Sequence, residues 1–303
     1  MTKNVAVLMG GFSAERQVSL SSGAECAKAL EKGGYKVRTI DVSRDIAELQ
    51  AALTPRPDVC FNALHGPYGE DGNIQGLLNF MQIPYTHSGV LASSLAMDKV
   101  MAKHLFAAAG IPVAEDLICT REELMAGTAI ELPFVIKPVN EGSSVGVQII
   151  LSRDDMLTFS DNYWPYTGKV MVERFIPGRE LTVGVMGDRA LPVTEVVTDR
   201  AFYDYDAKYE IGGSTHILPA PIDEDLTKEV QRLALLAHQS LGCRGVSRSD
   251  FRYDAETGTL FILELNTQPG MTPTSLVPEM AMLAGTDFVE LVSWMVENAA
   301  CDA

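Results

Sequence analysis

The stretch RSDFRYDAETGTLFILELNTQPG, residues 248–270, constrains the fold more than any other part of the chain. It predicts two strands that are joined by a turn at residues 253–258 and paired antiparallel. Side chains two residues apart on a strand point to the same side of the sheet. We therefore expect Arg248 and Asp250 on the first strand to share one face with Glu264 and Asn266 on the second.

This predicted face would bring together two carboxylates, an amide oxygen and a guanidinium. Mg²⁺ prefers oxygen ligands, uses one or two carboxylates and completes its shell with water and phosphate oxygens. An arginine suits the developing charge of a phosphate or an oxyanion. The alternative is an ordinary solvated sheet face, although Leu263 and Leu265 alternate with the polar residues and an apolar run, residues 260–262, precedes them. These residues alone leave both interpretations open.

The composition excludes several classes of protein. A chain of 303 residues with 47% hydrophobic residues can bury a large core, and its length favours two or three domains. No apolar run is long enough to span a bilayer, and the first residues lack the features of a signal peptide. A net charge of −16 argues against nucleic-acid and membrane partners. Five scattered cysteines are typical of reduced thiols, so we expect a cytoplasmic protein.

Strands and helices alternate over the first ninety residues. Strands are expected at residues 5–9, 35–42 and 58–64, with a helix through residues 24–30 and another at residues 46–53. This rhythm predicts a parallel sheet that binds ligands at the carboxyl ends of its strands. The loops at those ends, residues 10–23 and 64–72, are rich in glycine and polar residues, as expected of loops that form a site.

The remaining chain predicts two further regions. One helix is expected from residue 90 to 109, where Gly110 and Pro112 stop it. We expect domain edges near residues 96 and 180. The elements predicted after the helix are strands at 134–138, 147–150, 170–175, 180–185 and 191–197, a helix at 223–241, the strand pair described above, and helices after Pro273.

Isolated charged residues suggest an anion site. Lys137 lies in an apolar strand, where a lysine is costly unless it meets an anion. The glycine loop at 141–146 offers backbone N–H groups for phosphates but is not a Walker A loop. Lys99 is a second candidate contact, or a solvated helix lysine. Glu173 and Glu180 suit an adenine amino group and ribose hydroxyls, although surface ion pairs with neighbouring arginines are the more ordinary interpretation.

Other candidates lie in the loops. Glu15 would bind a substrate ammonium or complement a helix N-terminus. His65 is either a structural residue held by hydrogen bonds or part of a site. The polar, aromatic residues around Lys208 and Tyr209 suggest a mobile lid or a plain surface loop.

Taken together, these motifs match a known family. The chain resembles the D-alanine–D-alanine ligases of the ATP-grasp superfamily over essentially its whole length. The matching blocks are GGFSAER at 10–16, LHG at 64–66, MDK at 97–99, VIKP at 135–138, EGSSVG at 141–146, FYDYDAKY at 202–209, RSD at 248–250, ELNTQPGMT at 264–272 and SLVP at 275–278. Any one block is weakly specific, but their order and spacing are very specific.

The resemblance implies an α/β (α+β) architecture, the ATP-grasp fold. A Rossmann-like parallel-sheet substrate domain would span residues 1–96, a central domain residues 97–180, and a catalytic domain residues 181–303 with a lid loop at 199–216. The second and third domains would enclose ATP. The family further implies a homodimer that makes D-alanyl-D-alanine for peptidoglycan synthesis, with ATP and two Mg²⁺ or Mn²⁺ ions and with release of ADP and phosphate.

The resemblance also implies a role for each candidate. A first D-alanine would be phosphorylated to an acyl phosphate, and the amine of a second D-alanine would displace the phosphate. The roles are catalytic for Glu15, Ser143, Tyr209, Arg248 and Gly270; substrate-binding for His65, Ser275 and Leu276; nucleotide-binding for Lys99, Lys137, Ser144, Glu173, Ile176, Glu180 and Lys208; and metal-binding for Asp250, Glu264 and Asn266.

The chain departs from the family pattern at Ser247, Leu265 and Thr274, where glycine, alanine and histidine are more frequent. Tyr209 favours a dipeptide product over D-alanyl-D-lactate. The alternatives are another ATP-grasp ligase or a nucleotide-binding regulator without turnover. A nicotinamide dehydrogenase is excluded because residues 10–13 lack GxGxxG spacing. The base that deprotonates the second amine is not assigned.

Overall fold

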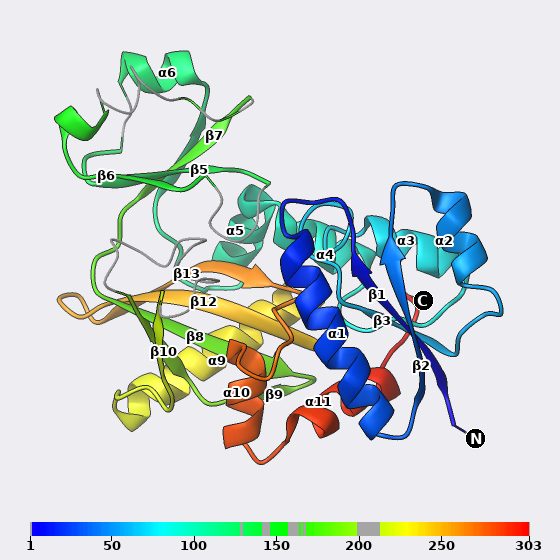
Figure 1. The fold of residues 1–303 in the computed structure, drawn as a ribbon. Helices are drawn as coiled ribbons and strands as arrows, with labels where there is room; N and C mark the ends of the chain where they lie inside the picture. The colour runs from blue at the N-terminus through cyan, green and yellow to red at the C-terminus, as the bar shows by residue number, and fades with distance from the viewer. Residues whose placement is uncertain are drawn as a thin grey trace.

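The computed structural model describes residues 2–127, 130–140, 146–156, 164, 166, 168–198 and 213–302. Over these residues the chain forms three β-sheets with helices packed against them (Figure 1). The strand orders are β2-β1-β3, β4-β7-β5-β6 and β11-β10-β8-β12-β13, with β9 paired to β8. This confirms the predicted α/β class.

The N-terminal sheet is parallel, as predicted. Its central strand β1 is almost wholly buried, which explains the apolar run near the N-terminus. Helix α1 ends at Gly33, close to the predicted glycine stop. The elements of this region are β1 (Asn4–Gly10), α1 (Arg16–Lys32), β2 (Lys36–Val42), α2 (Ile46–Ala52), β3 (Val59–Asn62) and α3 (Asn73–Phe80).

The helix expected from residue 90 to 109 is in fact two helices, so that prediction is wrong. Helix α4 (Val90–Met97) and helix α5 (Lys99–Ala108) meet at Asp98. Asp98 has an extended backbone, and its carboxylate accepts hydrogen bonds from the backbone N–H groups of Val100 and Met101, both at 3.0 Å. Aspartate favours this N-cap geometry over the helix interior. As a result, Lys99 becomes the first residue of a new helix.

The central sheet is antiparallel and has its own core. Buried apolar residues of β5 and β7, including Ile136 and Val172, pack there with Leu124 of helix α6. The elements are β4 (Asp116–Cys119), α6 (Arg121–Ala126), β5 (Phe134–Pro138), β6 (Gln148–Ile150) and β7 (Val170–Arg174).

The third sheet contains the strand pair of residues 248–270. Helix α9 covers one face of this sheet, where Val230 and Leu233 pack in one core with Val183 and Phe251 (Figure 1). The elements are β8 (Arg179–Met186), β9 (Arg189–Ala190), β10 (Thr194–Val197), β11 (Thr215–Ile217), α9 (Glu224–Ser240), β12 (Val246–Asp254) and β13 (Thr259–Asn266), followed by α10 (Leu276–Leu283) and α11 (Phe288–Glu297).

The predicted antiparallel pairing of these two strands is confirmed. Strands β12 and β13 are antiparallel, with Arg248 opposite Asn266 and Asp250 opposite Glu264. A register shift follows Asp250, because Phe251 pairs with Ile262 and Leu263 is an additional residue in β13. The four polar residues are therefore cross-strand neighbours on one face, at the end of the sheet nearest the N-terminal region (Figure 1).

The N-terminal sheet and the C-terminal helices share one hydrophobic core. It includes Val7 of β1 and Leu30 of α1 together with Met280 of α10 and Leu291 of α11. This packing holds the start of α1 close to the loop after β13: Ser22 accepts a hydrogen bond from the backbone N–H of Met271 at 3.2 Å. Helix α1 and the loop after β13, about 250 residues apart in the chain, are thereby brought together.

The three sheets fall within residues 4–62, 116–174 and 179–266. The domain boundaries at 96 and 180 remain a prediction. In the part of the chain that the structure describes, no helix has the length and apolarity needed to cross a membrane.

Candidate active site

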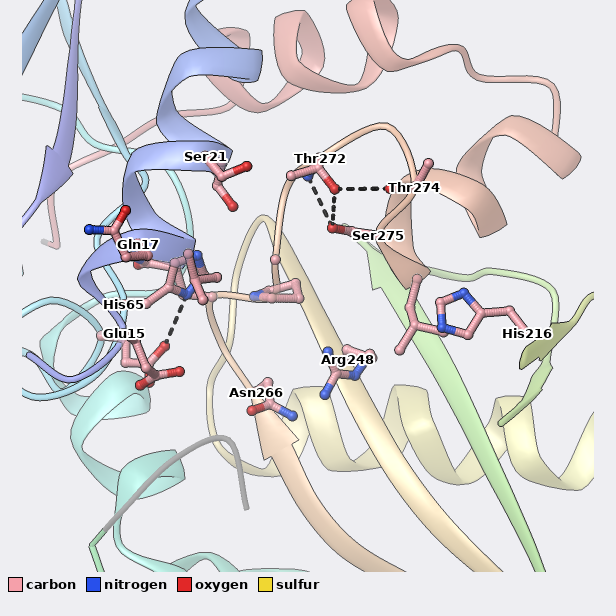
Figure 2. A pocket seen from close by; sticks show the side chains of 17 residues that line it. Glu15, Gln17, Ser21, His65, His216, Arg248, Asn266, Thr272, Thr274 and Ser275 are labelled. Atoms are coloured by element: carbon pink, nitrogen blue, oxygen red, sulfur yellow. Dashed lines mark hydrogen bonds and ion pairs between the residues drawn. The ribbon is translucent and has the colours of Figure 1, made fainter. Parts of the chain in front are cut away.

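A cavity of about 420 Å³ opens where the start of α1, the loop after β3 and the ends of β12 and β13 meet (Figure 2). It collects predicted residues from distant parts of the chain. Those that line it are Glu15, His65, Arg248, Asn266, Gly270, Ser275 and Leu276. The predicted amino-acid contacts in the described residues therefore surround one space, together with Arg248 and Asn266 of the predicted metal face.

Glu15 is buried at the edge of this cavity, with 5% of its surface exposed. It is the N-cap residue of α1, and its side chain makes no capping hydrogen bond. The neighbouring loops are tied together by the Ser13 hydroxyl, which donates to the His65 carbonyl at 2.6 Å. Gly66 allows this approach: a Cβ there would lie 2.8 Å from Glu15 Oε2. Glu15 is thus a buried carboxylate facing the cavity.

His65 is also buried and has an acidic neighbour that the sequence analysis did not single out. Its Nδ1 lies 3.7 Å from Oε2 of Glu70, which lines the same cavity. Its Nε2 is buried without a hydrogen-bond partner within the described residues. Glu70 is in the polar loop at 64–72, so the loop composition pointed to this region although not to this residue.

Asp250 lies at the centre of the polar face. Arg248 donates to both of its carboxylate oxygens, with Nε–Oδ1 at 2.8 Å and Nη2–Oδ2 at 2.7 Å. The Asn266 amide donates to Oδ2 at 3.1 Å, and the Thr182 hydroxyl donates to Oδ1 at 2.6 Å. Glu264 completes the face, and its Oε2 lies 3.8 Å from Nζ of Lys99.

The donor set of this face fits magnesium. Asp250, Glu264 and the Asn266 amide oxygen supply hard oxygen ligands, and Mg²⁺ needs only one or two carboxylates from the protein. Asp250 is 8% exposed and the Glu264 side chain 21%, so the carboxylates lie where burial makes a compensating cation favourable. Over the described residues no cluster of three or more His, Cys, Asp or Glu could hold a metal ion. A dense all-protein metal cage is therefore absent from those residues.

Lys99 connects this face to the main cavity. A small cavity of about 30 Å³ is lined by Lys99, Glu264, Asn266 and Glu70. It shares Asn266 and Glu70 with the larger cavity. A phosphate group near Lys99 would consequently be adjacent to a molecule bound beside Glu15 and His65.

Glu173 forms a buried ion cluster with two lysines. Its Oε2 lies 2.6 Å from Nζ of Lys137, and its Oε1 lies 2.5 Å from Nζ of Lys103. Burial alone raises the pKa of Glu173, but the charges of Lys137 and Lys103 outweigh it and hold the pKa below its usual value. The surface ion pair considered for Glu173 is therefore wrong, and Lys137 meets its anion within the protein.

Lys103 was missed from the sequence, although a signal existed. It lies three residues before Phe106 and thus on the same, buried face of helix α5. It also contacts Asp116 at 2.8 Å. A lysine on the apolar face of a helix requires a buried partner, as at Lys137.

Ile176 and Glu180 are brought together by Arg252, a second missed residue. Arg252 donates from Nε to the Ile176 carbonyl at 3.1 Å, and its Nη1 lies 3.4 Å from Glu180 Oε2. Its position two residues after Asp250 places it on the polar face of β12, so the alternation used for Arg248 and Asp250 also pointed to it. Of the arginines considered as partners of Glu180, Arg179 instead pairs with Glu195 at 2.7 Å.

The N-terminus of α10 forms the opposite wall of the main cavity. Ser275 is its N-cap residue, but the Ser275 hydroxyl makes no cap bond and contacts Thr272 instead (Figure 2). The first backbone N–H groups of α10 thus have no capping side chain, which favours an anion there. The remaining predicted residues, Ser143, Ser144, Lys208 and Tyr209, lie outside the described residues.

Comparisons with known proteins identify the family of this chain. Residues 105–297 match the family model "D-ala D-ala ligase C-terminus", and residues 46–88 match "D-ala D-ala ligase N-terminus". The chain is 60% identical to a D-alanine–D-alanine ligase of Rhodospirillum rubrum over the full length of both. It is 59% identical to one of Agrobacterium fabrum, covering 99% of this chain and 98% of the relative.

Solved structures show the same fold. The D-alanine–D-alanine ligase of Bacillus anthracis complexed with ATP superposes with a TM-score of 0.83 at 30% identity, over 98% of this chain and 97% of that one. The VanG D-Ala:D-Ser ligase of Enterococcus faecalis gives 0.82 at 27% identity, over 98% and 99%. The fold and site define an ATP-grasp ligase. Within that class, the chain belongs to the D-alanine–D-alanine ligase family, which makes D-alanyl-D-alanine with ATP for peptidoglycan synthesis.

Proposed function

We propose that this chain joins two D-alanine molecules at the 420 Å³ cavity, with ATP bound between the central and C-terminal sheets. The observation that carries the proposal is the meeting of the buried Glu15 carboxylate with Arg248 and Asn266 around one space. An ammonium site and a site for phosphoryl chemistry are thereby adjacent. High identity to D-alanine–D-alanine ligases supports the choice of substrate.

The first amino acid would be bound through its ammonium group. Glu15 supplies the negative charge, and His65, with Glu70 beside it, closes the same side of the cavity. A carboxylate oxygen of this first D-alanine attacks the γ-phosphorus of ATP. The bond from that phosphorus to ADP breaks, and an acyl phosphate forms. Catalysis of this step consists mainly of positioning and charge neutralisation. By the family resemblance, Ser143 and Tyr209 would form a hydrogen-bonded link with Glu15.

The phosphates would be bound by Lys99 and Lys137, joined by Ser144 and Lys208 according to the resemblance. Glu173 and Ile176 would lie near the adenine and Glu180 near the ribose. Asp250, Glu264 and Asn266 would hold two Mg²⁺ or Mn²⁺ ions, which neutralise phosphate charge when bound. The hydrogen bonds to Asp250 from Arg248 and Asn266 orient this carboxylate in advance.

The second amino acid would be bound at the N-terminus of α10. Ser275 and Leu276 receive its carboxylate, and its amine nitrogen attacks the acyl carbonyl carbon. Arg248 and the Gly270 backbone N–H stabilise the oxyanion that forms. Phosphate then leaves with its bonding electron pair, and the amine proton passes to a base that we do not assign. Because Arg248 is held in bidentate fashion by Asp250, its guanidinium is positioned before the charge develops.

We further propose a homodimer in the cytoplasm. Phe80 is 90% exposed and Leu91 is 70% exposed, which makes both side chains candidates for this interface. The scattered thiols suit a reducing compartment. Light scattering of the purified chain tests the dimer, and a mass of one chain at micromolar concentration would exclude it.

The test of the reaction is phosphate release from Mg-ATP. We expect release with D-alanine, together with D-alanyl-D-alanine detected by mass, and none with L-alanine or without an amino acid. When D-lactate or D-serine is added beside D-alanine, D-alanyl-D-alanine should remain the main product. ATP binding without stimulation by D-alanine would contradict the assigned substrate.

A further inference from the structure

An imidazole outside the predicted set enters the main cavity from strand β11. His216 lines the cavity on the same wall as Thr274, Ser275 and Leu276 (Figure 2). It comes from the edge strand of the third sheet, about sixty residues before α10 in the chain. The predicted subsite for the second carboxylate therefore has a histidine that the sequence analysis left without a role.

Glu279 orients this histidine. The Nδ1 atom of His216 lies 2.7 Å from Oε2 of Glu279 in the first turns of α10. The other ring nitrogen, Nε2, has no hydrogen-bond partner within the described residues. A histidine held at Nδ1 by a carboxylate has its ring orientation set and Nε2 left for a ligand.

We propose that His216, positioned by Glu279, binds the carboxylate of the second amino acid and thereby selects it. The assignment rests on the proposed function of this cavity. In the bound complex the ring donates from Nδ1 to the Glu279 carboxylate and from Nε2 to a carboxylate oxygen of the substrate, beside the N-terminus of α10. His216 thus adds a side-chain donor beside the backbone N–H of Leu276, whereas the Ser275 N–H already donates to the Thr272 carbonyl at 2.9 Å.

The surroundings favour a carboxylate over an ammonium at this wall. The N-terminus of α10 carries unsatisfied N–H groups and a partial positive charge. Arg248 lines the same cavity, whereas the buried carboxylate Glu15 faces it from the start of α1. Thr274, where the family more often has histidine, offers no ring on this wall. An anion is therefore stabilised here and a cation beside Glu15.

Replacement of this pair should leave the fold intact. The side chains of His216 and Glu279 are 22% and 32% exposed, and partly exposed ion pairs contribute little to stability. The lost contact would instead appear in the binding of one substrate.

The experiment compares His216→Phe with His216→Gln in dipeptide synthesis over a range of D-alanine concentrations. Two apparent Michaelis constants, one for each D-alanine, are fitted. We expect the Phe variant to raise the constant for the second D-alanine about tenfold or more. The constant for the first D-alanine and the rate at saturation should stay within about twofold. The Gln variant, whose amide still donates, should recover most of the loss.

Glu279→Ala should weaken the binding of the second D-alanine, as His216→Phe does, because it removes the carboxylate that orients the ring. His104→Phe, an exposed histidine on α5, is the matched control and should change neither constant. Unchanged binding of the second D-alanine in His216→Phe would overturn the assignment. The assignment would also be overturned if His216→Phe lowered the rate at saturation and His216→Gln did not restore it, because that result would identify His216 as a general base. If the wild type makes no dipeptide, the proposed function fails and the assignment fails with it.

Discussion

Asp250 is the residue that links Arg248 to the predicted metal face. Asp250→Asn removes one proposed metal ligand and the charge that holds the guanidinium, so we expect the rate of dipeptide synthesis to fall about 100-fold or more. Steady-state kinetics over a Mg²⁺ titration measures the loss, with circular dichroism to confirm folding. The matched control is Ser249→Ala, next on the strand, because the buried Ser249 hydroxyl lacks a partner within the described residues. Equal activity of Asp250→Asn and the control would refute the role of Asp250.

Glu173 is a buried carboxylate shared by two lysines, one of which also contacts Asp116. Glu173→Gln leaves Lys103 and Lys137 buried without their shared carboxylate, and we expect the free energy of unfolding to fall by about 3 kcal/mol or more. Urea unfolding at pH 7 measures the change. Glu25→Gln, in the exposed pair with Lys28, should change it by about 0.5 kcal/mol or less. A similar small change in Glu173→Gln would show that the buried cluster is not stabilised by this carboxylate.

The junction between α4 and α5 depends on one N-cap. Asp98→Ala removes the acceptor for two backbone N–H groups, and we expect a loss of about 1 kcal/mol in the free energy of unfolding. Because Lys99 is the first residue of α5, fraying would also weaken ATP binding several-fold. Asp98→Ser preserves a capping oxygen and serves as the control. Calorimetric titration with a non-hydrolysable ATP analogue, alongside urea unfolding, provides both readouts. If Ala and Ser behave alike, the cap does not position Lys99.

Buried histidines should govern the stability of the entire chain in mild acid. Burial lowers the pKa of His87 to about 3, assisted by the nearby charge of His65, and lowers that of His238 to about 4. The ordinary value is 6.5, so below about pH 6.5 the unfolded chain binds protons at these positions that the folded chain does not. As the pH falls below about 6.5, the free energy of unfolding should therefore fall by about 1.4 kcal/mol for each pH unit and each of these two histidines.

The test is the slope of unfolding free energy between pH 6 and pH 5. Carboxylates whose pKa lies below the usual 4.5, such as Glu173, lose their contribution only at lower pH and do not confuse this window. Asparagine is tolerated in the left-handed backbone at His87, where φ is 68°. His87→Asn should therefore reduce the slope by about 1.4 kcal/mol per pH unit, the contribution of one proton. His104→Gln, exposed on α5, should leave the slope unchanged. An unaltered slope in His87→Asn would show that His87 is already protonated in the folded protein.

The packing of the whole molecule explains how the cavity is formed. Its two sides come from segments about 250 residues apart, and the shared core of β1, α1, α10 and α11 holds them together. Cys26 of α1 supports this contact by donating from Sγ to the Met271 carbonyl at 3.4 Å. The amino-acid site therefore belongs to neither sheet alone.

Local pattern was sufficient for the parallel N-terminal unit, the strand pair and the shared face of Arg248, Asp250, Glu264 and Asn266. Side-chain alternation and turn residues act between neighbours, so the chain encodes these features within short windows. Local pattern also contained overlooked signals, such as Lys103 on an apolar helix face and Arg252 two residues after Asp250. The break at Asp98 is local too, but helical periodicity through residues 90–109 concealed the N-cap.

Only the tertiary structure decided which distant groups meet. The pairing of Glu173 with Lys103 and Lys137, the approach of Glu70 to His65, and the contact of His216 with Glu279 join segments that no periodicity relates. Their partners are set by how the sheets and helices pack, because a buried charge is stable only beside the opposite charge that packing supplies. Residue types along the chain thus determined the chemistry available, and packing determined which of those groups share a cavity.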